Sequence, residues 1–385
     1  MNLLNIPYID ELIALRRDIH AHPETGFHEI RTAGIIAEAL ERYGLAVYQG
    51  LNKTGVVGVL KAGSGERMIG LRADIDALPL TEANTFSHRS RHTERMHACG
   101  HDGHTTMLLG AARYLSEHPD FDGAVAFIFQ PAEESEGGAA GMIEDGLFQK
   151  FPISSVYGLH NWPDLPVGEM AVVAGPVMAG VSRFEITIQG RGGHAAMPHL
   201  ANDVIVASSQ LVTALQTITS RCLSPSDPAV VSVTQINAGN VWNILPEKAS
   251  LRGTMRFLRP EIQEKIETSM TRLVSGIAAA HDVRADVKFI YVNPPTINTA
   301  TEADICLSVA RGILGEDKVR NNMSPSMAAE DFSYMLGRCP GCYVWLGNGT
   351  GVLHSARYDF NDAILSMGVS YWVKLTQTLL PPGAD

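Results

Sequence analysis

Residues 123–138 read GAVAFIFQPAEESEGG, and the fold class follows from this stretch. The first eight residues are almost all apolar, which is typical of a strand buried on both faces of a sheet. Glu133 and Glu134 follow the strand directly, in front of a glycine-rich turn. Enzymes with α/β sheets place their reactive groups beyond the carboxyl ends of such strands. The stretch therefore predicts an α/β sheet with a candidate site at its edge. The alternative is that Glu133 and Glu134 only mark the start of a helix, because negative charges are favoured at helix N-termini.

Helical and strand-like patterns alternate on both sides of this strand. The expected helices cover residues 8–20, 29–43, 103–116 and 137–148, and the expected strands cover 55–61, 68–73 and 155–160. Asp102 precedes the third helix and is of the residue class that caps helix N-termini. The alternation predicts a mixed α/β sheet with helices on both faces.

The pattern changes after residue 180. From 183 to 292 the expected order is strand, helix, strand, strand, helix, strand, which is the ferredoxin-like split motif. The earlier alternation returns after Asn293-Pro294-Pro295, with helices at 302–315 and 362–379 around a strand at 342–346. We therefore expect a larger α/β domain in two parts and an inserted ferredoxin-like α+β domain. The expected boundaries are 1–179 and 294–385 for the larger domain and 180–293 for the insertion.

Charge and cysteine content limit the classes of partner. The 385 residues carry a formal net charge of −11, which disfavours nucleic acid or an anionic membrane as a partner. Five sparse cysteines do not suggest a disulfide framework and fit a reducing compartment. The first residues lack the pattern of a secretion signal, and no apolar run is long enough to span a bilayer. We expect a cytoplasmic protein.

The densest group of possible metal ligands is the segment MHACGHDGH, residues 96–104. Cys99 and His101 are two residues apart, so an extended backbone directs both side chains to the same side. Thiolate and imidazole are good ligands for zinc-like metals. A structural cysteine beside surface histidines is the alternative, and Asp102 either caps the following helix or orients a histidine.

Two further histidines, His160 and His354, lie at or after the ends of strands, where a lone histidine is more often structural. Ligand-type residues nevertheless recur at the ends of strands throughout the chain. A two-metal site needs about five protein ligands together with open positions for water and substrate. Cys99, His101, Glu134, His160 and His354 meet that number, and Glu133 is then available as a general base.

A second arrangement of cysteines imitates a different metal enzyme. Cys339-Pro-Gly-Cys342, together with His22-Pro23-Glu24, has elements of the zinc-deaminase signature. The two parts lie at opposite ends of the chain, no proline precedes either cysteine, and no second CxxC completes a structural zinc site. A tight turn is the favoured interpretation of the CxxC.

Taken together, these segments resemble the metallo-aminoacylase and hippurate hydrolase family, which includes the plant auxin-conjugate amidohydrolases. The resemblance runs through nearly the whole chain, and its most specific parts are MHACGHDGHT and QPAEE. The matching segments are RDIHAHPE (17–24), LRADIDALP (71–79), MHACGHDGHTTM (96–107), FQPAEESEGG (129–138), GLH (158–160), GGHAAMP (192–198), NILP (243–246), AEDF (329–332) and LHS (353–355).

The resemblance implies metal-dependent hydrolysis of the amide bond of N-acyl amino acids, releasing a carboxylic acid and an amino acid. It implies a general base at Glu133 and the five metal ligands named above, Cys99, His101, Glu134, His160 and His354. It also implies an inserted lid domain through which two chains form a homodimer or a higher oligomer. In the lid, it implies that His194 polarises the scissile carbonyl in the partner's site and that Asn243 contacts substrate; Arg256 is a candidate partner for a substrate carboxylate. The alternatives are a dipeptidase or carboxypeptidase with the same chemistry, and a non-catalytic relative that binds metal or a ligand.

One position departs from the wider superfamily, in which many relatives bind metal through a His-x-Asp pair. Here the same place reads Asp74-Ile75-Asp76, so Cys99-x-His101 is the expected substitute for the missing histidine. A site of two divalent ions that contains a thiolate is compatible with zinc, manganese, cobalt or nickel.

Overall fold

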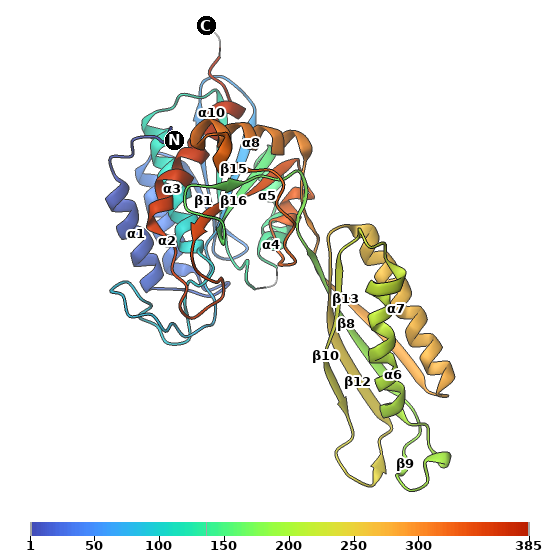
Figure 1. The fold of residues 1–385 in the computed structure, drawn as a ribbon. Coiled ribbons are helices and arrows are strands. Elements are labelled where there is room, and N and C mark those ends of the chain that lie inside the picture. The colour runs from blue at the N-terminus through green and yellow to red at the C-terminus, as the bar shows by residue number, and fades with distance from the viewer. Residues whose placement is uncertain (1, 136, 384–385) are drawn as a thin grey trace. The chain divides into compact units, whose positions relative to one another are not determined.

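The fold is described from a computed structural model, which covers residues 2–135 and 137–383; Glu136 of the PAEESE stretch lies outside them. The chain divides into two compact units (Figure 1). The large unit consists of Met1–Gly175, Ile297–Ser324 and Asp331–Asp385, and the small unit of Pro176–Thr296 and Pro325–Glu330. The large unit is a mixed α/β domain and the small one is an inserted α+β domain, so the predicted fold class is confirmed.

The large unit is built on one mixed sheet of eight strands. Four neighbouring strands in its middle (β4, β3, β5 and β16) are mutually parallel, so their carboxyl ends share one edge. In spatial order the strands are β1 (Ala46–Leu51), β2 (Gly55–Ala62), β4 (Gly123–Gln130), β3 (Met68–Asp74), β5 (Ile153–Pro163), β16 (Gly341–Gly349), β6 (Met170–Ala171) and β15 (Val319–Arg320). All eight residues of β4 are buried, as its apolar sequence predicts.

Helices cover both faces of this sheet. One face shares a hydrophobic core with α1 (Ile9–Ala21), α2 (Ile30–Arg42), α3 (His101–Glu117), α8 (Ala300–Leu314) and α10 (Leu365–Leu379). Side chains alternate along β16: Cys342 and Val344 belong to that core, whereas the Tyr343 ring faces the other way and lies 5.5 Å from the Phe332 ring. Phe332 precedes α9 (Ser333–Leu336), which packs against α4 (Gly138–Glu144), so these short helices cover the opposite face.

Two helix predictions were wrong in detail. Helix α3 begins at His101, and its N-cap is Gly100 rather than Asp102. Gly100 has φ 98°, and a Cβ there would lie 1.9 Å from Asn161 Oδ1, so only glycine fits. The helix predicted at 137–148 is divided into α4 and α5 (Leu147–Lys150), because Gly146 between them adopts φ 93°.

The small unit has the predicted β-α-β-β-α-β order. Its four strands are antiparallel in the order β10-β12-β8-β13, which is the ferredoxin-like arrangement. Helices α6 and α7 lie side by side over one face of this sheet (Figure 1) and enclose a separate core. In chain order the elements are β8 (Gly180–Gln189), α6 (Val204–Thr217), β10 (Ala229–Ala238), β12 (Lys248–Phe257), α7 (Pro260–Ala280) and β13 (Arg284–Asn293).

Several short elements complete the fold. Strand β9 pairs with β11 inside the small unit, and β7 pairs with β14 in the connecting segments. Their bounds are β7 (Gly175–Met178), β9 (Gly193–His194), β11 (Ile244–Leu245) and β14 (Thr296–Asn298), with single turns of helix at Pro198–Leu200, Ile218–Cys222, Glu316–Lys318 and Asp362–Ile364.

The first turn of α3 gives a test of how tightly the fold is packed beneath the candidate site. A Cβ at Gly103 would lie 2.2 Å from the buried Phe360 ring, whereas a Cβ at Gly34 on α2 would meet nothing within 4 Å. Gly103→Ala should therefore lower the free energy of unfolding by about 1–3 kcal/mol. Gly34→Ala should raise it by up to about 1 kcal/mol. Urea unfolding of both variants measures the difference, and equal effects would contradict the packing.

Candidate active site

The carboxyl edge of the four parallel strands gathers the polar side chains. Asp74 is the last residue of β3, Glu133 and Glu134 follow β4, His160 lies near the end of β5, and His354 follows β16. Cys99 and His101 reach the same edge from the loop before α3 and from its first residue. Because the strands are parallel neighbours, segments far apart in the sequence end side by side.

All five side chains predicted from the sequence as ligands are brought together. The Sγ of Cys99 lies 3.4 Å from the Nε2 of His160, and the Nε2 of His354 lies 3.0 Å from the Oε1 of Glu134. In three overlapping groups the possible donor atoms all lie within 4.8 Å of one another. These groups are Cys99 with His101 and His160, Cys99 with Glu134 and His354, and His101 with Glu133 and Glu134.

His101 shows whether this arrangement suits a cation. Its Nδ1 lies 2.9 Å from the Asp76 carbonyl oxygen, while its buried Nε2 has no hydrogen-bond partner among residues 2–135 and 137–383. Burial alone would lower the pKa of His101, but Asp74, Asp76 and Glu134 outweigh burial and raise it to about 10. The surroundings therefore favour a positive charge at this point, and the His101 Nε2 that lacks a hydrogen bond lies 3.8 Å from the Asp74 carboxylate. Both features fit a divalent metal ion.

Cys99 and His160 differ from His101 in their preferred charge. Burial, followed by Glu134 and Glu133, raises the pKa of the Cys99 thiol well above its usual range. Burial, His104 and His101 hold the pKa of His160 well below its usual range. The neutral ring of His160 donates from Nδ1 to the Asn161 carbonyl oxygen at 2.6 Å, which leaves the Nε2 lone pair directed toward Cys99. Such a nitrogen is a ready metal ligand.

Asp76, for which no role was predicted, holds the two glutamates in place. Its Oδ1 accepts the backbone N–H of Glu133 and its Oδ2 that of Glu134, each at 3.0 Å. One carboxylate therefore fixes the backbone of both residues. In the sequence, this role could have been predicted from the Asp-x-Asp pattern, because two carboxylates stand at the end of a buried strand.

Asp74, the first residue of the Asp74-Ile75-Asp76 segment, is already engaged on both oxygens. Its Oδ1 lies 2.6 Å from His104 Nδ1, and its Oδ2 accepts from Arg72 at 2.7 Å. Arg72 is buried and also donates to Gln130 and Asp331. Asp74 therefore connects His104 to a buried ion-pair network, and it is less suited to metal than the five side chains above.

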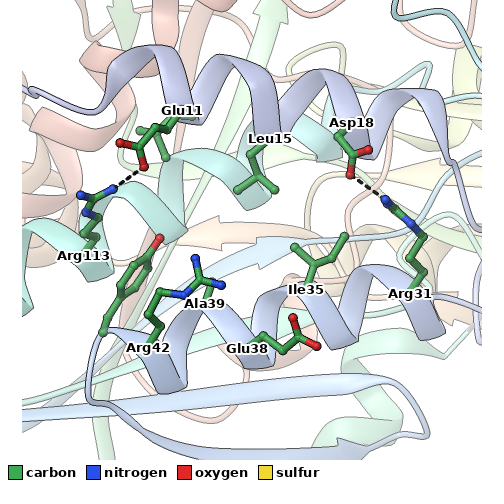
Figure 2. A pocket seen from close by; sticks show the side chains of 11 residues that line it. Glu11, Leu15, Asp18, Arg31, Ile35, Glu38, Ala39, Arg42 and Arg113 are labelled. Carbon is green, nitrogen blue, oxygen red and sulfur yellow. Dashed lines mark hydrogen bonds and ion pairs between the residues drawn. The ribbon is translucent and has the colours of Figure 1, made fainter.

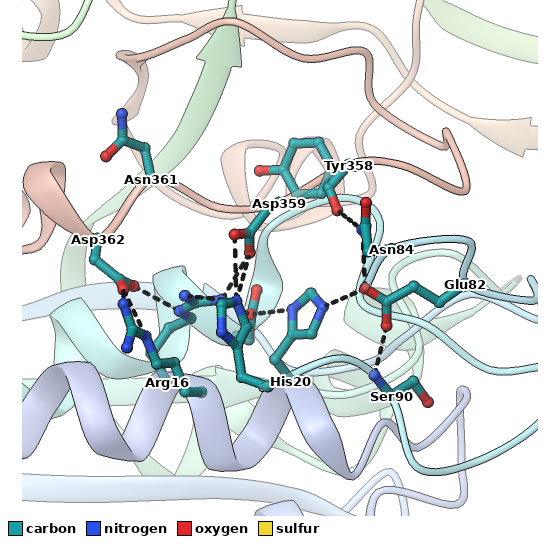
Figure 3. Close-up of polar contacts among 12 residues, drawn as sticks. Arg16, His20, Glu82, Asn84, Ser90, Tyr358, Asp359, Asn361 and Asp362 are labelled. Atoms are coloured by element: carbon teal, nitrogen blue, oxygen red, sulfur yellow. Dashed lines mark hydrogen bonds and ion pairs between the residues drawn. The ribbon is translucent and has the colours of Figure 1, made fainter. Parts of the chain in front are cut away.

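A second buried network connects α1 to the first turn of α3, and Figure 3 shows Arg16 and His20 of α1 within it. Asp102 accepts from His20 Nδ1 at 2.9 Å and forms an ion pair with Arg16 at 3.4 Å, so α3 is tied to α1 next to His101. The other nitrogen of His20 lies 3.3 Å from Glu82, in the loop before the Cys99 segment. Burial lowers the pKa of His20, but Asp102 and Glu82 outweigh it and raise it to about 9. In the sequence, this network could have been found from Arg16 and His20, which lie on the same face of α1 as its apolar residues.

The lid residues predicted from the sequence lie within the small unit at two separate places. His194 and Asn243 are neighbours: His194 pairs with Ile244, and the Ala195 N–H donates to the Asn243 carbonyl oxygen. Both side chains are exposed. Arg256 lies near the other end of β12, opposite Val181 of β8. Burial and Arg183 lower the pKa of Arg256, so an anion beside it would be favoured.

A pocket between two N-terminal helices is not part of this arrangement. A pocket of about 360 Å³ lies between α1 and α2, closed at its ends by the ion pairs Glu11–Arg113 and Asp18–Arg31 (Figure 2). None of the five clustered side chains lines it. The candidate active site is therefore identified by its ligand chemistry and not by the depth of a cavity.

Comparison with known proteins agrees with this chemistry. The model of peptidase family M20/M25/M40 matches residues 70–378. The chain belongs to this family. It is 42% identical over 366 residues to a hippurate hydrolase of Campylobacter jejuni, covering 95% of each chain. It is 38% identical over 372 residues to an N-acetylcysteine deacetylase of Bacillus subtilis, covering 96% of this chain and 97% of that one.

A solved structure of a dinuclear metal-binding M20 peptidase from Bacillus subtilis has a TM-score of 0.87 and 34% identity, covering 98% of this chain and 100% of that one. The family predicted from the sequence motifs is therefore confirmed, and so is the enzyme class: this M20 protein is an amidohydrolase.

Cobalt provides a direct test of the thiolate at the site. Adding Co²⁺ to the chelated protein should produce a near-ultraviolet band from thiolate-to-metal charge transfer, because a coordinating cysteine is deprotonated by the ion. Cys99→Ser should abolish the band. Cys339→Ser, which changes a half-buried cysteine of the CxxC turn, should leave it intact. A band that survives in Cys99→Ser would exclude this residue as a ligand.

Proposed function

We propose that this M20 protein hydrolyses the amide bond of N-acyl amino acids of the hippurate or N-acetyl type. The observation that carries the proposal is the grouping of Cys99, His101, Glu134, His160 and His354 beside Glu133. The names of the relatives support the substrate class, because two of them are a hippurate hydrolase and an N-acetylcysteine deacetylase. Free dipeptides, the substrates of a dipeptidase, are the competing class.

The five side chains would hold two divalent ions. Three overlapping donor groups offer more than one position for a cation, and a solved relative is described as dinuclear. One thiolate, three imidazoles and one carboxylate form a mixed set of soft and hard ligands, compatible with zinc, manganese, cobalt or nickel.

Glu133 is the residue for proton transfer. When bound, divalent ions lower the pKa of water and polarise the substrate carbonyl. Glu133 would accept a proton from the attacking water and pass it to the leaving amine. Asp76 supports this role because it fixes the Glu133 backbone. His194 would donate a hydrogen bond to the oxyanion, and Asn243 and Arg256 would contact the rest of the substrate, with Arg256 facing its carboxylate.

The small unit is proposed to form a homodimer through its exposed end. Apolar side chains are exposed on the two segments that carry His194 and Asn243, and Trp242 is fully exposed. Such a group in one place is typical of a protein interface. This surface consists of Met197, Leu200, Val241, Trp242 and Ile244.

Distances along the lid support the contribution of a second subunit. Lys248, which follows the His194–Asn243 ribbon, and Arg256 are eight residues apart on one strand, or about 26 Å at 3.3 Å per residue. One small substrate cannot contact both ends of the same lid. A site that uses His194 and Arg256 together therefore requires two chains.

The cysteines and the net charge support a cytoplasmic location and disfavour nucleic acid as a partner. All five cysteines are free thiols, which fits a reducing compartment such as the cytoplasm. The net charge of −11 disfavours nucleic acid. Within the part of the chain that the structure describes, no helix has both the length and the apolar character needed to cross a bilayer.

Replacement of the proposed base separates catalysis from metal binding. Glu133→Gln keeps the size of the side chain but cannot accept the water proton, so hydrolysis of N-benzoylglycine should fall by about 100-fold or more. Metal content, measured by atomic emission, should stay at the wild-type level. Near-full activity of Glu133→Gln would refute the assignment of Glu133 as the base.

The substrate class is tested on the wild-type enzyme, which should hydrolyse N-benzoyl and N-acetyl amino acids in preference to free dipeptides. A preference for dipeptides would refute the proposed substrate class.

Mixing two inactive variants tests whether His194 acts in the partner's site. In a heterodimer of Glu133→Gln and His194→Ala, one site would regain an intact Glu133 and an intact His194. Random exchange should restore about one quarter of the wild-type rate, because half of the dimers are mixed and each has one complete site. If His194 acts within its own subunit, every site lacks one residue and mixing restores nothing.

A further inference from the structure

Three consecutive backbone amides after β4 are held by two buried carboxylates. The N–H of Ala132 donates to Glu29 Oε1 at 2.9 Å, and Asp76 accepts the next two, from Glu133 and Glu134. Glu29 is fully buried and Asp76 is 1% exposed. Charge-assisted hydrogen bonds of this kind are stronger than bonds between neutral groups. The segment that carries both glutamates therefore depends on anchors from outside it.

Ala132 needs such an anchor because its backbone is strained. It adopts φ 54°, in the left-handed region, and its side chain is fully buried. An L-residue with a Cβ is disfavoured there, and strained residues persist only where their surroundings fix them. The conformation of Ala132 sets the direction in which the next two residues leave the strand. A change in the backbone conformation of Ala132 would therefore redirect the Glu133 and Glu134 side chains.

Glu29 is itself fixed from two sides. It precedes α2, and its Oε2 accepts from the Thr54 hydroxyl at 2.6 Å. Burial raises the pKa of Glu29, and its bonds to Thr54 and Ala132 oppose that effect. Its side chain makes no hydrogen bond to the α2 amides: the N–H groups of Arg31 and Thr32 donate instead to Glu24. The start of the helix is held by one glutamate and the Ala132 amide by another.

We propose that Glu29 is a positioning residue of the active site, which holds Ala132 in its left-handed conformation and so aims Glu133 and Glu134. The inference rests on the roles proposed above for these two glutamates. Glu29 touches neither substrate nor metal in this assignment. Its influence passes through one backbone hydrogen bond to the residue before the base.

The decisive experiment combines Glu29→Ala with Ala132→Gly. Glu29→Ala should lower kcat about 10–100-fold with little change in KM, as loss of a supporting hydrogen bond does around metal sites. Ala132→Gly should restore much of that kcat in the double variant, because glycine adopts φ 54° without strain. Glu29→Gln should stay close to wild type, because its amide oxygen still accepts the Ala132 N–H. If Glu29→Ala does not fold, Glu29→Asp, whose carboxylate is one methylene short, replaces it with the same expectation.

Two matched controls separate positioning from general support of the fold. Glu24→Ala loosens the start of α2 without touching the Ala132 amide. Thr54→Val removes the other hydrogen bond of Glu29 while keeping the bond to Ala132. Both should keep kcat within a few-fold of wild type. A loss of kcat in Glu24→Ala as large as in Glu29→Ala, or failure of Ala132→Gly to restore activity, would overturn the proposal.

Amide exchange in the chelated protein gives a measurement that does not depend on activity. Glu29→Ala should increase the exchange rate of the Ala132 amide by at least about tenfold, because that proton loses its acceptor, whereas Glu24→Ala should not. Unchanged exchange in Glu29→Ala would refute the anchoring. This result is independent of Glu133→Gln, whose full activity would refute the proposed base but leave the exchange test unaffected.

Discussion

Buried negative charge around His101 is the constraint on which the rest of the structure depends. Asp74 and Asp76 are almost completely buried, and Glu134 is mostly so, within reach of the same imidazole. Carboxylates in such a place are costly unless each has partners. Arg72 and His104 satisfy Asp74, and backbone amides satisfy Asp76. A cation in their midst lowers the remaining repulsion, which is why the site suits metal ions.

The main features of the fold and the grouping of the candidate ligands could be predicted from the sequence. The apolar run of β4 with two glutamates at its end locates the edge of the sheet, and the parallel order of neighbouring strands brings His160 and His354 to the same edge. The β-α-β-β-α-β order of elements in the inserted unit follows from residue periodicity along the chain. Each helix or strand is local, so local patterns predict it, and the parallel arrangement of the strands then accounts for the grouping of distant side chains.

The supporting contacts could not be predicted in the same way. Asp102 has the residue type of an N-cap, but Gly100 is the N-cap of α3, and the Asp102 carboxylate meets His20 from α1 instead. The left-handed backbone of Ala132 has no signature in its residue type, because alanine disfavours it. The acceptor for its amide lies about a hundred residues earlier. Such contacts depend on the assembled fold.

The position of β16 has a consequence for synthesis of the chain. This strand pairs with β5 in the middle of the large sheet, yet the whole inserted unit lies between them in the sequence. A ribosome adding about 5–20 residues per second needs roughly 10 to 35 s to pass from Pro163 to Gly341. During that interval the edge of β5 has no neighbour and can pair with other chains. The nascent polypeptide is therefore exposed to aggregation throughout the translation of its smaller domain.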